Sequence, residues 1–374
     1  MTWILSTGMV SPLGLGREES ISSWRELHSG TGEKASALLP NNRWPTEGFP
    51  RQDAGLVVGF NARKQLPDRK ATKLMSRESQ LAVYAAVEAG AGDALDGALA
   101  EDVGAFATAG YEVSSLPESE AMLAASRQED DPSRLSLARL FGEGRDCYNP
   151  LSPLKILPNM PLFHATSTLG LRGPHLSLGS SPASGLVALG EASDALADGD
   201  CERALVLGSD CQLEEFRAQL LVEAQIVPSL APAEGAVAMV LGRSPTPSKK
   251  AAAYPSARLV AWDAGQQSPG AGKDLPAELC SGLIEDSGQP DLIFSYLWGL
   301  PDADESEQTM LRKLGTRVVC TRPMLGWMGA AHGLLDVALG VAEIEAGNAQ
   351  RVLVTARGVL GDIAAVMLEA GAPA

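Results

Sequence analysis

The sequence predicts an α/β protein made of two similar halves, and a repeat within the chain is the main reason. Residues 185–206 and 333–354 align without a gap, and each copy combines an apolar helix, a helix-ending glycine, a polar turn and a β-rich strand. A further strand recurs at 234–241 and 362–368. Because each unit must bury the apolar faces of its strands and helix, the two copies are expected to pack against each other.

A polar run at 243–250 separates the two copies and is typical of a loop. We therefore expect an N-terminal half at 1–245 and a C-terminal half at 251–374. At 374 residues, with 45% hydrophobic and 20% charged residues, the chain can bury a large core as a globular protein does. Its apolar runs are too short to span a membrane, and residues 1–5 do not resemble a signal peptide, so we expect a cytoplasmic location.

Charge and cysteine content argue against several classes of function. The formal net charge is −16, so a nucleic-acid partner is not expected, because binding phosphate requires a basic face. The five cysteines are scattered and include no closely spaced pair, which argues against both a disulfide framework and a metal site. No glycine loop typical of phosphate binding stands out. We therefore expect neither a metal ion nor a cofactor.

The most informative segment is 173–185, which is typical of a strand followed by a sharp turn of small residues, with an apolar helix from about 185 to 197. Such a turn presents one side chain at a helix N-terminus, where acyl-transfer enzymes keep their nucleophile. The segment resembles the nucleophile region of the β-ketoacyl synthases, which are condensing enzymes with the thiolase fold. In that family, a cysteine stands at the position of Pro182.

The resemblance extends over nearly the whole chain. Residues 6–16 are similar to the family's opening strand and turn, and residues 158–160 and 170–174 to the run that leads to the nucleophile. Residues 324–333 are similar to the region around its second active-site histidine. In this order and spacing, the segments imply a thiolase-like five-layer α-β-α-β-α sandwich formed by the two duplicated halves.

The same resemblance places non-catalytic residues at the catalytic positions. A decarboxylating condensation needs a thiolate to hold the acyl chain and two imidazoles to stabilise the developing enolate. The family's cysteine corresponds to Pro182, its first histidine to Tyr296 and its second histidine to Trp327. Arg322 stands where the family has a lysine. We therefore expect that the chain has no ketosynthase activity of its own.

Positions that contact the thioester substrate in the family are changed as well. The threonines that bind the pantetheine arm correspond to Trp298 and Leu300, and the gating phenylalanine beside the nucleophile corresponds to Val359. Neither Trp298 nor Leu300 replaces both hydroxyl groups, and an indole at position 298 would tend to fill the tunnel.

This pattern resembles the chain-length factors, or KSβ subunits, of type II polyketide synthases. Such a subunit pairs with an active, cysteine-bearing ketosynthase, and the bulk of its interface side chains limits the acyl tunnel of the heterodimer. The resemblance places Tyr111, Leu154 and Lys155 at that interface. In the better-known chain-length factors, the residue that replaces the cysteine is typically glutamine, whereas this chain has Pro182. Because of this difference the subgroup is not assigned, and the pathway stays open between an aromatic polyketide, an aryl polyene and a fatty-acid-like product.

Acyl carrier proteins are acidic, so an acidic chain is a poor docking site for one by itself. We therefore expect a carrier to be an indirect partner, reached through the active ketosynthase. A third interpretation keeps direct binding and treats the chain as a homodimeric scaffold that holds a carrier without turnover.

A serine-dependent acyltransferase or hydrolase is the competing enzyme hypothesis. Ser180 and Ser181 lie in a stretch close to the G-x-S-x-G pattern of hydrolases. A serine nucleophile needs a base, and none of the four histidines falls at the family's two active-site positions. His332 aligns with Ser184 in the repeat, where capping or packing is expected.

Overall fold

The structure is a computed structural model of the chain. The part of the chain that it describes comprises residues 2–29, 36–41, 52–90, 94–95, 98–111, 116–179, 181–214, 217, 231–245, 257–267, 275–297, 301–358 and 360–371.

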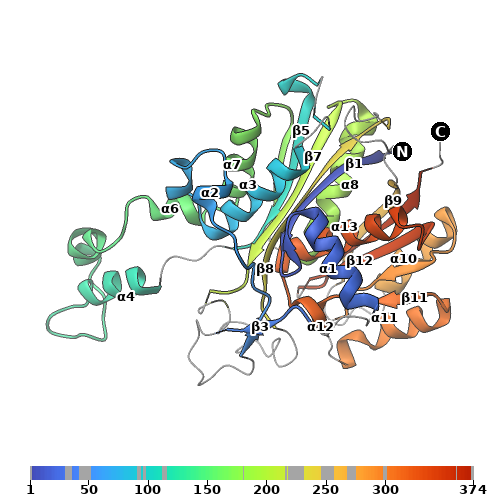
Figure 1. The fold of residues 1–374 in the computed structure, drawn as a ribbon. Helices are drawn as coiled ribbons and strands as arrows, with labels where there is room; N and C mark the ends of the chain where they lie inside the picture. The colour runs from blue at the N-terminus through green and yellow to red at the C-terminus, as the bar shows by residue number, and fades with distance from the viewer. Residues whose placement is uncertain are drawn as a thin grey trace.

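Two sets of five strands have the same order and the same directions (Figure 1). The first set, in spatial order, is β1 (Thr2–Ser11), β8 (Glu234–Gly242), β7 (Arg203–Cys211), β5 (Val103–Ala109) and β6 (His175–Leu178). The second is β9 (Ala257–Gln266), β13 (Asp362–Ala370), β12 (Arg351–Arg357), β10 (Leu292–Phe294) and β11 (Arg317–Val319). In each set the last three strands are parallel and the other two pairings are antiparallel. The predicted duplication is confirmed.

The two sets join through their first strands. β1 pairs with β8 along most of its length and also pairs with the start of β9. The strands therefore form one continuous hydrogen-bonded series that crosses from one half to the other. The boundaries at 1–245 and 251–374 stay a prediction.

Helices form three layers around the strands (Figure 1). In the middle layer, α8 (Pro182–Asp198) and α13 (His332–Glu345) pack on each other, and each contacts strands of both sets. The outer layers are α3 (Arg77–Gly90) with α7 (Met160–Leu169) on the first set, and α10 (Leu275–Ser287) with α11 (Pro301–Leu314) on the second. This arrangement is the predicted five-layer α-β-α-β-α sandwich.

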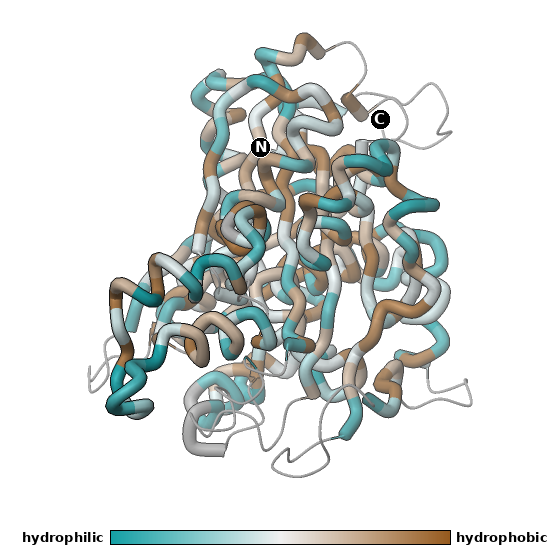
Figure 2. Tube along the Cα trace, turned by 90° about the vertical axis from the view of Figure 1, so that its left-hand side faces the viewer, coloured by the Kyte–Doolittle hydropathy of each residue, from teal (hydrophilic) through white to brown (hydrophobic). Residues whose placement is uncertain are grey.

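The middle position of α13 explains its composition. Its residues are buried from His332 to Ile344, so the helix has no solvent-facing polar side. Figure 2 shows the same distribution for the whole molecule, with hydrophobic residues along the inner elements and hydrophilic ones at the periphery.

The remaining elements lie around this core. They are α1 (Arg17–Ser29), α2 (Ala62–Gln65), α4 (Leu116–Ala125), α5 (Leu137–Arg139), α6 (Ser152–Ile156), α12 (Arg322–Leu325), β2 (Gly14–Leu15), β3 (Leu39–Pro40), β4 (Asp53–Ala54), the 3-10 helices Ala71–Lys73, Ala100–Asp102 and Gly329–Ala331, and a π-helical turn at Leu140–Gly144. Figure 1 shows that the segment from α4 to α6 extends away from the body as an arm.

None of the helices in the described ranges has the length and apolar character needed to cross a membrane. Within the same ranges, no three or more histidine, cysteine or acidic side chains are grouped so that they could hold a metal ion.

Candidate functional site

The turn before α8 is closed by its own side chains. Ser181 is the N-cap residue, and its hydroxyl accepts a hydrogen bond from the backbone N–H of Ala183 (3.1 Å). The hydroxyl of Ser184 accepts one from the N–H of Ser181 (3.2 Å), which completes a capping box. Pro182 is buried at the first helical position, where its fixed φ favours the helix and its missing N–H costs little. The turn is therefore built as a helix start and carries no nucleophile at Pro182.

Ser181 also links the two halves. Its hydroxyl donates a hydrogen bond to Oδ2 of Asp362, at the start of β13. The neighbouring Gly358 has no room for a Cβ atom, because one would overlap both of these groups. A cavity of about 510 Å³ lies beside the contact, between the start of α8 and the ends of β9 and β13 that face it. The Ser181 hydroxyl is thus engaged by both the helix cap and a carboxylate at the edge of this cavity.

A second cluster forms where β10, α12 and the following turn meet. Tyr296 is fully buried, and the guanidinium carbon of Arg322 lies 3.8 Å from the centroid of its ring. This is a cation–π contact in a desolvated environment. Trp327 lies beside Tyr296, and burial raises the pKa of the Tyr296 phenol.

A polar chain lies next to this cluster. Nδ1 of His332 accepts a hydrogen bond from the N–H of Met328 (3.4 Å), so a neutral His332 carries its proton on Nε2. Nε2 then donates to the hydroxyl of Thr321 (2.8 Å), which donates to Oδ1 of Asp336 (2.7 Å). Burial lowers the pKa of His332 well below its usual range, and the charge of Arg322 acts in the same direction. His332 is therefore uncharged and serves as a packing residue.

The pKa of Asp336 responds to the same environment in the opposite direction. Burial raises it from 3.8 to about 7, although the hydrogen bond from Thr321 and the charge of Arg322 both lower it. Asp336 is therefore the group of this region that titrates near neutral pH.

The turn before α8, called the elbow from here on, lies next to this cluster. Gly333, which follows His332, packs against Pro182, and a Cβ atom at Gly333 would lie only 2.7 Å from the carbonyl oxygen of Pro182. The starts of α8 and α13, which are equivalent in the duplication, therefore meet at one point of the middle layer. Pro182, Tyr296 and Trp327 thus belong to one region of the molecule.

Comparison with known sequences assigns the family. The sequence model described as "Beta-ketoacyl synthase, N-terminal domain" matches residues 3–243, which is more than half of the chain. The chain belongs to the β-ketoacyl synthase family. No curated protein sequence matches it.

Solved structures of ketosynthases share the fold along the entire chain. The ishigamide ketosynthase/chain length factor matches with a TM-score of 0.68 and 21% identity, over 99% of both chains. The AntDE:AntF complex of a type II polyketide synthase ketosynthase with its acyl-carrier protein matches with a TM-score of 0.72 and 15% identity, over 99% of both chains. A β-ketoacyl synthase from Burkholderia phymatum STM815 matches with 0.74 and 18%, again over 99% of both chains.

The structure describes only some of the other residues that the family resemblance names. Ser180, Trp298, Leu300 and Val359 lie outside the described residues. Tyr111 follows β5 with 62% of its surface exposed, and its hydroxyl oxygen would lie 3.8 Å from a Cβ atom at Gly179, a residue of the cavity wall.

Leu154 and Lys155 lie on α6, at the base of the arm, where Leu154 is exposed. At the base of the arm, α6 contacts α7, which is the helix that flanks the edge strand β6.

Asp362, Thr321 and Asp336 were not predicted as residues of this region. The contact between Ser181 and Asp362 joins positions far apart in the chain, so no local pattern indicates it. For His332 and Asp336 a signal exists, because residues four apart share one face of a helix. Both lie on α13, which is so apolar overall that its sequence does not reveal a polar face.

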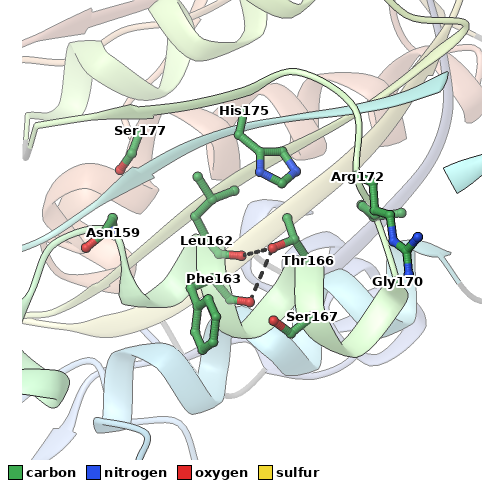
Figure 3. Close-up of a pocket in the computed structure, with 10 residues that line it drawn as sticks. Asn159, Leu162, Phe163, Thr166, Ser167, Gly170, Arg172, His175 and Ser177 are labelled. Atoms are coloured by element: carbon green, nitrogen blue, oxygen red, sulfur yellow. Dashed lines mark hydrogen bonds between the residues drawn. The ribbon is translucent and has the colours of Figure 1, made fainter. Parts of the chain in front are cut away.

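The open edge of the first set of strands carries a groove. β6 is the last strand of its set, and its residues His175 and Ser177 are exposed. A groove of about 680 Å³ lies between β6 and α7 (Figure 3). Phe163 of α7 is 53% exposed along it.

Proposed function

We propose that this chain is a catalytically inactive ketosynthase-like subunit that pairs with an active, cysteine-bearing β-ketoacyl synthase and shapes its acyl tunnel. The observation that carries the proposal is the burial of Tyr296 under the guanidinium of Arg322 and beside Trp327, next to a helix that Ser181 caps and that begins at Pro182.

The chemistry of these residues supports inactivity. Proline offers no atom that could hold an acyl group, and a phenol whose pKa is raised by burial does not act as an imidazole does at neutral pH. The indole of Trp327 can donate a hydrogen bond but has no basic nitrogen, so it cannot exchange a proton as an imidazole does. The region therefore lacks both the nucleophile and the imidazole pair that a decarboxylating condensation requires.

Features of the surface support a partner of the same fold. Among the described strands β6 is the last of its sheet, and such an edge strand favours pairing with another strand. The adjoining groove and the arm expose large apolar side chains, among them Phe163, Leu137 (70% exposed) and Phe141 (71% exposed). Large apolar side chains exposed on the surface favour a protein interface. Similar structures include a ketosynthase/chain length factor and a type II polyketide synthase ketosynthase with its acyl-carrier protein.

The test is co-expression of the tagged chain with ketosynthases encoded beside it, followed by native mass spectrometry and product analysis. We expect a one-to-one complex with a cysteine-bearing ketosynthase. Replacing the partner's active-site cysteine with alanine should abolish all product, since this chain supplies no second site. A stable homodimer that does not bind the ketosynthase would reject the proposal, as would product formation by the complex with the cysteine variant.

The serine-dependent hypothesis receives less support from the geometry. The hydroxyl of Ser181 accepts the capping hydrogen bond from Ala183 and donates to Asp362. No histidine of the described residues hydrogen-bonds to it, whereas a serine nucleophile is activated by such a base. A role as helix cap accounts for its contacts.

A further inference from the structure

The start of α3 carries a fully buried carboxyl group. Glu78 is the second residue of this helix, and its side chain is shielded from solvent. A carboxyl group is costly to bury unless hydrogen bonds compensate for the water that it loses. The hydrogen-bond partners of Glu78 therefore indicate what this group does in the fold.

One partner is the backbone at the end of β5. Oε1 of Glu78 accepts a hydrogen bond from the N–H of Gly110 (2.6 Å), the residue that follows β5, and another from the hydroxyl of Ser209 on β7 (3.2 Å). The N–H of Gly110 also donates to the carbonyl oxygen of Ser209 (3.0 Å). Glu78 is thus a second acceptor for this N–H, and it fixes the direction in which the chain leaves the sheet.

Another carboxyl group closes the opposite side of Gly110. A Cβ atom at Gly110 would lie 2.1 Å from Oδ1 of Asp210, so the backbone is in close contact there. Asp210 is itself held in place, because it accepts hydrogen bonds from the N–H of Ala330 (2.9 Å) and the side-chain amide of Gln212 (2.8 Å). Gly110 therefore lies between two buried carboxyl groups, and Glu78 is the one that binds its N–H.

The start of α3 is anchored on both sides of Glu78. The hydroxyl of Ser76 accepts a hydrogen bond from the N–H of Ser79 (3.1 Å), which closes the first turn of the helix. Arg77 donates two hydrogen bonds to the carboxylate of Glu234 on β8 (2.8 and 2.9 Å). Because the neighbouring residues are held, the carboxyl group of Glu78 is a fixed support for the end of β5.

Tyr111 is the residue that this support positions. It follows Gly110 directly and is 62% exposed, and its hydroxyl oxygen would lie 3.8 Å from a Cβ atom at Gly179, on the wall of the cavity of about 510 Å³. Since the backbone conformation decides which side-chain rotamers are allowed, the bond to Gly110 also constrains the phenol ring.

We propose that Glu78 is a positioning residue for Tyr111, and that it thereby limits the length of the products that the complex makes. The step from position to product length rests on the proposed function, in which Tyr111 faces the acyl tunnel of the partner. The step from Glu78 to the position of Tyr111 depends on this chain alone, so the two steps are tested separately.

Three variants of the full chain provide the test. Glu78→Met keeps the length and the burial of the side chain but removes the acceptor, whereas Glu78→Gln keeps an acceptor oxygen. Glu343→Met is the matched control, because Glu343 is also a buried glutamate on a helix, and its side chain bonds to Trp24 and Arg317 instead. Thermal unfolding shows that each variant is folded and how much stability it loses.

The first measurement is amide hydrogen exchange at Gly110, followed by NMR in the chain alone. Glu78→Met should exchange about two- to tenfold faster than wild type, as expected for the loss of one hydrogen bond. Glu78→Gln and Glu343→Met should exchange at the wild-type rate. Equal rates in wild type and Glu78→Met would overturn the inference, whether or not the chain pairs with a ketosynthase.

The second measurement is the product distribution of the complex with the ketosynthase. Glu78→Met should shift the products toward longer chains, but by less than Tyr111→Ala, because the ring is released and not removed. Adding Glu78→Met to Tyr111→Ala should cause no further shift, since no ring is left to position. Glu78→Gln should restore the wild-type distribution. A structural role alone would lower the yield without changing the distribution, which is the result expected for Glu343→Met.

A wild-type distribution in Glu78→Met, together with a shift in Tyr111→Ala, would overturn the link to product length. An additive shift in the double variant would do the same, as would the absence of any shift in Tyr111→Ala. Failure of the proposed function is distinguishable, because it is the absence of a complex with a ketosynthase. In that case the exchange rate of Gly110 decides the positioning role by itself.

Discussion

The guanidinium of Arg322 lies over the ring of Tyr296, with 3.8 Å between its central carbon and the ring centroid. The family resemblance aligns Tyr296 with a catalytic histidine and Arg322 with a lysine. In this chain the two residues pack directly against each other. Since both are buried, the contact forms away from water, where a cation–π interaction is strongest.

A double-mutant cycle measures this contact. We expect Arg322→Met and Tyr296→Leu to show a coupling free energy of unfolding of about 1–2 kcal/mol by urea denaturation. Combining Arg322→Met with Tyr84→Leu, on the outer helix α3, should give additive effects. A coupling near zero between Arg322 and Tyr296 would contradict the stabilising role.

The carboxyl of Asp336 makes stability depend on pH. Because burial raises its pKa from 3.8 to about 7 in the folded chain, its stabilising contribution is complete below about pH 4 and is lost as pH rises through 7. An asparagine side chain cannot ionise, so Asp336→Asn should gain stability relative to wild type across this interval, by up to about 4 kcal/mol. Denaturation at a series of pH values checks this, with Asp198→Asn at an exposed site as control. A constant difference between wild type and variant would contradict it.

The middle layer is closely packed where α8 crosses β9. Gly190 lies against the indole of Trp262, and a Cβ atom there would overlap the ring. Gly190→Ala should therefore lower the free energy of unfolding by about 1–3 kcal/mol. Gly282, on α10, has no atom within 4 Å of a Cβ position. Gly282→Ala should raise stability by about 0.5–1 kcal/mol through helix propensity. Similar effects at both glycines would show that packing at Trp262 is looser than described.

Replacing Ser181 distinguishes a structural role of this residue from a catalytic one. Ser181→Ala removes the helix cap and should cost about 0.5–2 kcal/mol of stability. Product formation by the complex with the ketosynthase should be unchanged, and a fluorophosphonate probe should not label Ser181. Labelling of this serine together with loss of activity in the variant would favour the serine-dependent enzyme.

The sequence predicted the fold and the helix of the elbow because both leave local signals. The glycine and the strand that follow α8 and α13 recur in register, and the small residues before Pro182 form a helix start. Contacts between distant segments leave no such pattern. The bond between Ser181 and Asp362 is an example, since it depends on how the two halves pack.

Tyr111 is the residue through which product length should respond to this chain. Its side chain is exposed at the end of β5 and lies beside Gly179, a residue of the cavity wall at the start of α8. If the partner's acyl tunnel ends against this face, removing the phenol ring deepens the tunnel, and Tyr111→Ala should shift the products of the complex toward longer chains. Mass spectrometry of the products measures the shift. Leu99→Ala, which truncates another exposed side chain before β5, should leave the distribution unchanged. An unaltered product length in Tyr111→Ala, with the complex intact, would remove Tyr111 from the tunnel wall and assign chain-length control to other residues of this face.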